Sequence, residues 1–199
     1  MANYTKTIVC LANSRKPPSG RCIAGKEVLE NGYGGWIRPI SARQTAEVSE
    51  EERHYKNGQD PRILDIIKVP MIGPAPSLHQ TENHIIDDRY YWRKTGALSW
   101  TDLTYLLDNP DTLWPNGGST FYGRNDRVKI EVAAKLKESL LLIKPEALTV
   151  GVQMEGGSFQ IQDGECELIS SIGGRDTSSL SQTQLPSASF LLSTTATTR

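Results

Sequence analysis

Short apolar runs separated by turn-rich segments make up the first part of the chain. Residues 5–12 (TKTIVCLA) and 63–72 (ILDIIKVPMI) are rich in β-branched residues and predict two strands. Residues 21–29 (RCIAGKEVL) predict another strand. The segment between the first and this one, residues 13–20 (NSRKPPSG), contains two prolines and a glycine that favour a loop. This pattern indicates a mainly β protein with short helices.

The stretch of residues 34–41 (GGWIRPIS) combines a strand pattern with candidate chemistry. Trp36 and Arg38 are two positions apart, so in an extended strand their side chains point the same way. An aromatic plane beside a guanidinium could bind an anionic planar ligand. The alternative is that Trp36 packs in the core and Arg38 forms a surface ion pair. Pro39 favours an edge or rim position for this strand.

Two helices are predicted in this part of the chain. Ser49 and Glu52 form a capping-box pattern that predicts a short helix over residues 50–55. Leucines at helical spacing predict a second one over residues 100–107. Further along, residues 128–132, 139–143 and 147–154 have strand character, and residues 158–161 could pair with the last of these across Gly156 and Gly157.

Charge is spread unevenly over the 199 residues. The formal net charge is −1, yet the first 46 residues carry seven Lys or Arg against two acids, a local excess of +5. This basic front suggests an anion-binding site, although a solvated charged face is the common alternative. No apolar run approaches the length of a membrane span, and no signal pattern is present, so we expect a cytoplasmic protein without membrane contact.

Candidate catalytic and metal-binding patterns are absent from the sequence. None of the common nucleophile, phosphate-loop, zinc-protease or dinucleotide motifs occurs, and the three histidines lack metal spacing. Three widely spaced cysteines argue against a zinc site or a disulfide framework. The sequence therefore favours a non-enzymatic module with neither cofactor nor metal, and it leaves enzymatic activity open.

Cations and aromatics alternate in residues 89–94 (RYYWRK). If this run is extended, Tyr91 and Arg93 share one face and Trp92 lies on the other, and one of the two faces is expected to be core. Stacking platforms beside positive charge are what single-stranded nucleic acid and nucleotide ligands require.

Three motifs carry a family resemblance. Residues 7–16 (TIVCLANSRK), 20–26 (GRCIAGK) and 35–41 (GWIRPIS) resemble the prokaryotic dual OB-containing domain. Weaker matches lie at residues 64–66, 80–83 (QTEN) and 139–145 (SLLLIKP). The resemblance extends from about residue 5 to about residue 159.

The resemblance implies two tandem small OB-like β-barrels that recognise nucleic acid or a nucleotide-type ligand, with a link to prokaryotic conflict or defence systems. The candidate ligand-binding positions within the matching motifs are Asn13, Ser14, Arg15, Lys16, Arg21, Trp36 and Arg38. We therefore expect a first barrel with helical insertions over residues 1–125. Family members continue with further strands where this chain does not, so we expect an incomplete second barrel over residues 126–168.

The last segment, residues 169–199, is predicted to be a disordered tail. From Ser170 to Arg199, 14 of 30 residues are Ser or Thr, and one apolar run, residues 190–192, remains.

Three functions compete at this point. The first is a non-enzymatic module that binds nucleic acid or a nucleotide. The second is a protein–protein interaction scaffold that uses the Tyr, Trp and Arg surface. The third is a nuclease or hydrolase whose site has no recognisable motif. Salt dependence separates the first two, because phosphate binding weakens steeply with salt.

Overall fold

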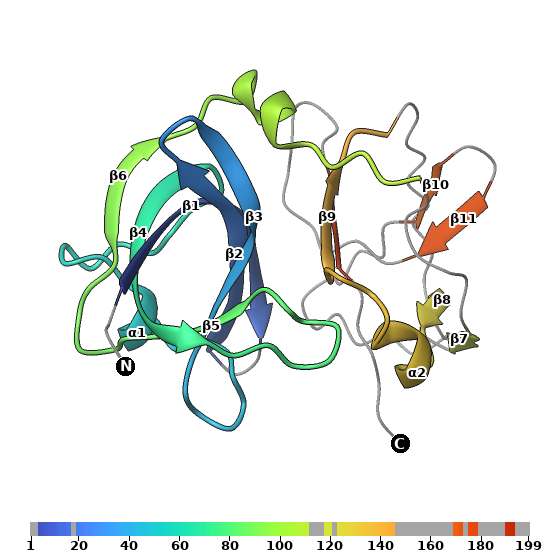
Figure 1. Ribbon diagram of the computed structural model, residues 1–199, viewed down its shortest axis with the longest axis horizontal. Coiled ribbons are helices and arrows are strands. Elements are labelled where there is room, and N and C mark those ends of the chain that lie inside the picture. The colour runs from blue at the N-terminus through green and yellow to red at the C-terminus, as the bar shows by residue number, and fades with distance from the viewer. Residues whose placement is uncertain are drawn as a thin grey trace, which may run out of the picture. The chain divides into compact units, whose positions relative to one another are not determined.

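The computed structural model describes residues 4–16, 19–111, 118–120, 123–145, 169–172, 175–178 and 190–193. The chain forms two compact units (Figure 1). One comprises residues 1–107 with the segment Lys135–Ser139, and the other comprises residues 108–134 and 140–199. Mainly β structure with few short helices confirms the predicted fold class.

Five strands of the first unit close into a ring. They are β1 (Tyr4–Lys16), β2 (Gly20–Leu29), β3 (Gly32–Ile40), β4 (Asp65–Pro74) and β5 (Asn83–Ile86), drawn from blue to green in Figure 1. Their order is β1-β2-β3-β5-β4, and β4 pairs back onto β1. Within this ring the β3–β5 pair is parallel and the others are antiparallel. Strand β6 (Arg93–Ala97) adds to the first half of β4.

The barrel interior is filled by alternate residues of these strands. On β4, the inward side chains Ile67, Val69 and Met71 are fully buried, whereas Ile66 and Lys68 between them are partly exposed. This is the alternation expected of a sheet with one buried face. The core cluster also draws on the other strands and two connections, through Ile8, Cys10, Ile23, Ile37, Val48, Tyr55, Ile86 and Trp92. Burial of each large side chain contributes about 1.5–3 kcal/mol.

Gly25 lets β1 and β2 approach closely. A Cβ atom at this position would lie 1.9 Å from the carbonyl oxygen of Val9. The pairing register of β1 with β2 shifts between Cys10 and Ala12, directly beside this contact. Such an irregularity bends a strand pair, as closure of a small barrel requires.

Pro39 lies inside the ring without disrupting it. The backbone N–H of Arg38 donates to the carbonyl of Glu82 beside β5, so the nitrogen of Pro39 faces β2 instead. The last β2–β3 pair is Gly25 with Ile37, and β3 has therefore left β2 where proline removes its donor.

The predicted capping box is confirmed. Helix α1 (Glu50–Arg53) begins after Ser49, whose hydroxyl accepts from the Glu52 N–H, while the Glu52 carboxylate accepts from the Ser49 N–H. It is shorter than predicted and ends before His54. The second predicted helix is present as a 3₁₀ helix, η1 (Asp102–Leu106).

The described part of the second unit contains β7 (Gly118–Thr120), β8 (Gly123–Arg127), α2 (Ile130–Ala133), β9 (Leu140–Ile143), β10 (Ile169–Ile172), β11 (Arg175–Ser178) and β12 (Phe190–Ser193). Within that part the strands form the pairs β7–β8, β9–β12 and β10–β11. The Asp108 carboxylate accepts from the Leu142 N–H at 2.8 Å, which ties the start of this unit to β9.

Two local predictions were wrong. Residues 13–16 continue β1 instead of forming a loop, because their backbone pairs with residues 20–23 of β2 in a hairpin whose polar side chains face solvent in part. Residues 130–133 form a helical turn where a strand was predicted. Backbone bonds to the carbonyls of Lys129 and Ile130 favour that turn over the β-branched propensity of the segment.

Several sequence predictions concern residues that are described only in part. Strands β10, β11 and β12 lie within the predicted tail at residues 169–199, and β12 contains the apolar run at residues 190–192. The other residues of the tail, and the strands predicted at 147–154 and 158–161, lie outside the described residues. The boundaries at residues 125 and 168 and the incomplete second barrel stay predictions.

Candidate functional site

The side chains of β2 and β3 that point away from the barrel interior form its outer face. Ile23 and Ile37 belong to the core cluster, so alternation places their neighbours on the opposite side. Directly opposed residues of an antiparallel pair share a face, and Lys26 is opposed to Trp36. We name this outward set the β2–β3 face; it consists of Cys22, Ala24, Lys26, Trp36 and Arg38.

Trp36 is buried, but not in the barrel core. Its exposed fraction is 3%, it is not part of the core cluster, and the Lys26 ammonium lies 5.7 Å from the centre of its ring. This is cation–π geometry. Trp36 is buried, as the second of the two interpretations made from the sequence expects, although it lies outside the core cluster. The cation beside its ring is Lys26, and not Arg38.

Arg38 belongs to a polar cluster on the same face. Its guanidinium lies 3.0 Å from the Glu82 carboxylate and donates to the Ser139 hydroxyl at 2.7 Å. The Ser139 hydroxyl in turn donates to Glu82. The side chains of Arg38 and Glu82 are 15% and 2% exposed, so this ion pair is largely withdrawn from water. Burial lowers the pKa of Arg38, and the Glu82 charge opposes that shift.

Several buried polar atoms of residues 79–83 have no hydrogen-bond partner among the described residues. Among the described residues, both ring nitrogens of His79, the Oε2 atom of Glu82 and the Oδ1 atom of Asn83 are buried without a hydrogen-bond partner. The pKa of His79 is lowered, first by burial and then by the nearby Arg38 charge. Such groups are costly to leave unsatisfied, so the cluster has capacity for further hydrogen bonds.

Neither partner of Arg38, Glu82 or Ser139, is among the candidate residues predicted from the sequence. Both lie in the weaker family motifs, at residues 80–83 and 139–145, and His79 lacks metal spacing in the sequence. The signal that could have pointed to these partners is that each weak motif contains a polar residue.

The other five candidate residues lie at the end of the β1–β2 hairpin. Register places Asn13, Arg15 and Arg21 on one side of the hairpin, and Ser14 and Lys16 on the other, which is the side of the β2–β3 face. The structure thus brings four of the seven candidates onto one surface and turns three away from it.

These hairpin residues differ in how far they are already paired. Asn13 donates to the Pro61 carbonyl at 2.7 Å, and Lys16 lies 3.8 Å from Glu47 with half of its side chain exposed. Arg15 is exposed and has no partner among the described residues. Among the seven candidate residues, Arg15 and Lys16 are therefore the cations most accessible to an anionic ligand.

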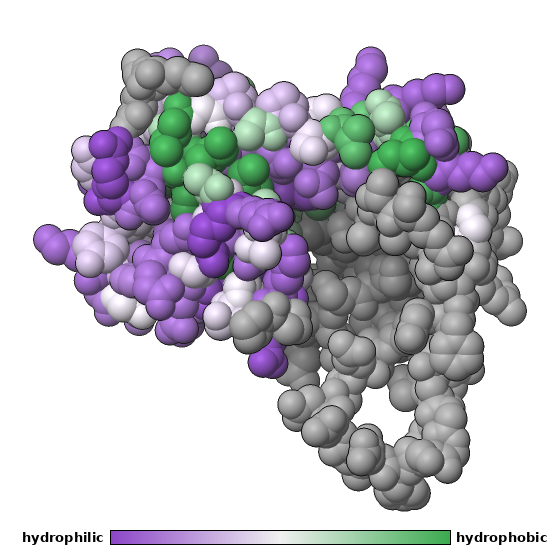
Figure 2. Space-filling view, turned by 90° about the horizontal axis from the view of Figure 1, so that it is seen from below, coloured by the Kyte–Doolittle hydropathy of each residue, from purple (hydrophilic) through white to green (hydrophobic). Residues whose placement is uncertain are grey.

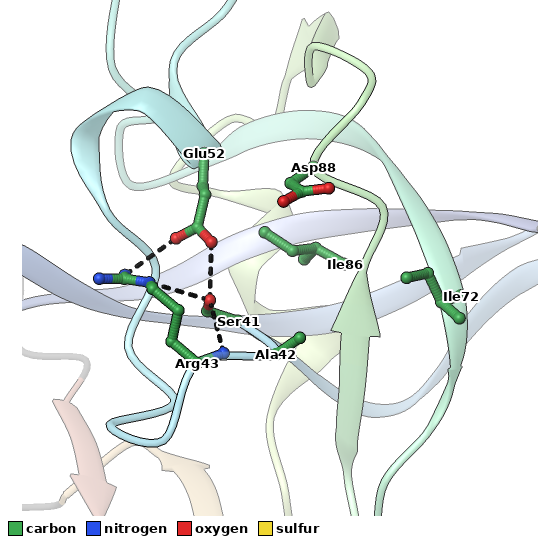
Figure 3. A pocket seen from close by; sticks show the side chains of 7 residues that line it. All are labelled: Ser41, Ala42, Arg43, Glu52, Ile72, Ile86 and Asp88. Atoms are coloured by element: carbon green, nitrogen blue, oxygen red, sulfur yellow. Dashed lines mark hydrogen bonds and ion pairs between the residues drawn. The ribbon is translucent and has the colours of Figure 1, made fainter.

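A pocket of about 230 Å³ lies where β3 and β5 end (Figure 3). Its polar wall is a closed network: the Ser41 hydroxyl donates to Glu52 at 2.6 Å, and the Arg43 guanidinium donates to Glu52 at 2.9 Å. Burial opposes ionisation of Glu52, but these hydrogen bonds and the Arg43 charge outweigh it and lower its pKa. Ala42, Ile72, Ile86 and Asp88 complete the lining.

The run Arg89–Lys94 is divided between core and surface. Trp92 is 1% exposed and belongs to the core cluster, whereas Tyr90 and Tyr91 are 58% and 56% exposed. The expectation that one face of this run is core is confirmed. Elsewhere, Figure 2 shows a mainly hydrophilic surface over the visible described residues, with hydrophobic residues confined to limited areas.

Among the described residues, no cluster of three or more His, Cys, Asp or Glu is arranged to hold a metal ion. Over the same part of the chain, no helix has both the length and the apolar character needed to cross a membrane.

The ring order, with its parallel β3–β5 pair, its helix between β3 and β4 and its outward β2–β3 face, defines an OB-type barrel. A comparison with known families agrees: the family described as the dual OB-containing domain matches residues 6–168, and the chain belongs to that family. The resemblance noted from the sequence is thereby confirmed. No curated protein and no solved structure matches the chain.

Proposed function

We propose that this chain is a recognition module that binds single-stranded nucleic acid or a nucleotide-type ligand on the β2–β3 face and the adjoining hairpin end. OB barrels bind oligonucleotides on the face of their second and third strands and through the neighbouring loops. The observation that carries the proposal is the exposed cationic hairpin end, with Arg15 and Lys16, beside the β2–β3 face of a closed OB-type ring. On that face Lys26 and Trp36 are largely buried, and Arg38 is ion-paired.

Local charge supports a phosphate-bearing ligand. Lys16 extends the face toward the hairpin end, and Arg15 lies on the other side of the same hairpin end. Neither cation is fully neutralised among the described residues. Because the net charge of the whole chain is −1, attraction of a polyanion depends on this local cluster. Binding should therefore weaken with salt.

The proposal is tested by titrating a labelled single-stranded oligonucleotide at several salt concentrations. For each phosphate contact that Arg15→Ala or Lys16→Ala removes, the slope of log affinity against log salt should fall by roughly 0.7. Lys56→Ala removes an exposed cation outside the site and serves as the control. Absence of binding at low salt, or equal slopes in all variants, contradicts the proposal.

Two finer parts of this proposal come from the family resemblance, namely a prokaryotic setting and a role in conflict or defence systems. The identity of the neighbouring genes tests them directly. A cytoplasmic location is proposed from the sequence pattern alone, and cell fractionation tests it.

A second candidate function is a protein–protein interaction scaffold. The exposed rings of Tyr90 and Tyr91 favour it, because tyrosine and arginine are enriched at interface hot spots. The Arg89 guanidinium lies 5.7 Å from the Tyr90 ring and is held by two 2.8 Å bonds to buried Asp87. Tyr90→Ala with Tyr91→Ala should leave nucleic-acid binding unchanged and abolish capture of a protein partner.

A further inference from the structure

Arg38 and Glu82 hold a hydroxyl group between them, and that group comes from Ser139 of the segment Lys135–Ser139. We propose that this pair is a recognition site for a ribose hydroxyl, so that the ligand is a ribonucleotide or RNA, and that Ser139 occupies the site until the ligand displaces it. The inference rests on the proposed function and names the chemical class of its ligand.

The geometry selects a hydroxyl over other groups. Ser139 Oγ accepts from Arg38 at 2.7 Å and donates to Glu82, so its place requires one atom that does both. A phosphate oxygen would accept from Arg38 but repel the Glu82 carboxylate, and an ammonium group could not accept from Arg38. A ribose 2′-hydroxyl both donates and accepts, and it is the group that distinguishes RNA from DNA.

The unpartnered hydrogen-bonding atoms of this cluster could bind a sugar, whereas serine leaves them without a partner. One Glu82 oxygen bonds Ser139, and among the described residues the other has no partner. A carboxylate with both oxygens available can accept from the two adjacent hydroxyls of a ribose, and acidic side chains bind ribose hydroxyls in this way in dinucleotide-binding folds. His79 and Asn83, 6% and 3% exposed, supply further unpartnered polar atoms beside it.

The location agrees with ligand binding on an OB-type barrel. Arg38 follows Trp36 by two residues on the β2–β3 face, and Glu82 and His79 belong to the connection between β4 and β5. Both regions bind ligands in OB barrels. The segment Lys135–Ser139 is attached there by two side chains of the barrel besides Glu82: Thr81 donates to the Lys137 carbonyl, and Arg38 donates to Ser139.

The test compares fluorescein-labelled oligouridylate with oligodeoxyuridylate of equal length, which differ in the 2′-hydroxyl, by fluorescence anisotropy at low salt with the full chain. We expect the wild type to bind the ribo-oligonucleotide roughly tenfold more tightly or better, as loss of a hydrogen bond to a charged group implies. The double variant Arg38→Met with Glu82→Met, which leaves the net charge unchanged, should bind both with equal affinity.

The variant Ser139→Ala is an independent test, because it leaves the Arg38–Glu82 ion pair in place. It removes the internal hydroxyl that competes with the ligand, so the ratio of ribo to deoxyribo affinity should rise. Ser99→Ala, which removes an exposed hydroxyl from a local turn, is the control and should leave the ratio unchanged. Should the double variant fail to fold, as judged by circular dichroism, Ser139→Ala decides alone.

The possible results distinguish failure of the ribose site from failure of the proposed function. Equal affinity of the wild type for both oligonucleotides, or an unchanged ratio in Ser139→Ala, overturns the ribose site and leaves the proposed function standing. No binding of either oligonucleotide, and none of adenosine or deoxyadenosine monophosphate, overturns the proposed function and this inference with it.

Discussion

At the scale of single residues, Gly25 has the least room for a side chain among the glycines that the structure describes. The Val9 carbonyl oxygen would lie 1.9 Å from its Cβ, and that oxygen belongs to backbone that pairs with β2. Gly25→Ala should lower the free energy of unfolding by about 1–3 kcal/mol or more, as overpacking does. Urea denaturation measures the effect.

Gly35→Ala is the matched control for that prediction. No atom lies within 4 Å of the position of its Cβ, so the substitution should change the free energy of unfolding by less than about 1 kcal/mol. Equal effects at the two glycines would show that β1 and β2 are not in close contact at Gly25.

His79 makes the stability of the barrel depend on pH. Burial and Arg38 lower its pKa in the folded chain, whereas the unfolded chain titrates near 6.5. Below that value the unfolded state binds the proton more readily, so the contribution of neutral His79 is present above about pH 6.5 and is lost as pH falls. His84, whose pKa is also lowered mainly by burial, acts in the same direction.

We therefore expect His79→Gln to lose less thermal stability than the wild type between about pH 7.5 and about pH 5.5. Thermal melting monitored by circular dichroism tests this. His54→Gln, at a partly exposed position on the surface, is the control and should follow the wild type. A wild-type profile in His79→Gln contradicts the account of this residue.

The sequence predicted part of the residue-scale chemistry. Spacing alone predicted that Trp36 and Arg38 share a face, and the structure places both on the outside of the barrel. It could not predict that Arg38 meets Ser139, because the two are 101 positions apart and no local pattern encodes a contact of that range.

At the scale of elements, α1 is held by one carboxylate with several partners. Glu52 caps the helix and also accepts from Ser41 and binds Arg43 (Figure 3). Ser49→Ala should lower the free energy of unfolding by about 1 kcal/mol through loss of the cap. Glu52→Ala should cost more than Ser49→Ala, because it also removes the partner of Ser41 and Arg43.

Glu50→Ala is the control within the same helical turn, since its side chain is exposed. Chemical denaturation of the three variants gives the order. A loss in Glu50→Ala as large as that in Glu52→Ala would mean that general charge, rather than the capping network, stabilises the helix.

Elements with strong local signals were predicted well, and those set by tertiary contacts were not. The alternating burial of β4 and the capping box of α1 both depend on residues that are close together in the sequence. Residues 13–16 have no apolar pattern, and they are extended because β2 offers them backbone partners. The closing pair β1–β4 joins residues about sixty positions apart, so its register is beyond any local pattern.

At the scale of the whole molecule, three distant segments meet at the Arg38–Glu82 ion pair. Removing one partner leaves a buried charge, so Arg38→Met alone should lower the free energy of unfolding by about 3–5 kcal/mol. Adding Glu82→Met should recover most of that loss, because apolar replacement of both partners is close to neutral. Denaturation curves of the two variants test this, and an equal loss in both would contradict it.

The central claim is that this OB-type barrel binds single-stranded nucleic acid or a nucleotide on its β2–β3 face and hairpin end. The most direct test is a titration of the ¹⁵N-labelled chain with oligouridylate at low salt, followed by amide and indole chemical shifts. We predict the largest shifts at Arg15, Lys16, Trp36 and Arg38, with Tyr90 and Tyr91 unchanged. Shifts confined to Tyr90 and Tyr91, or no shifts at all, would contradict the claim.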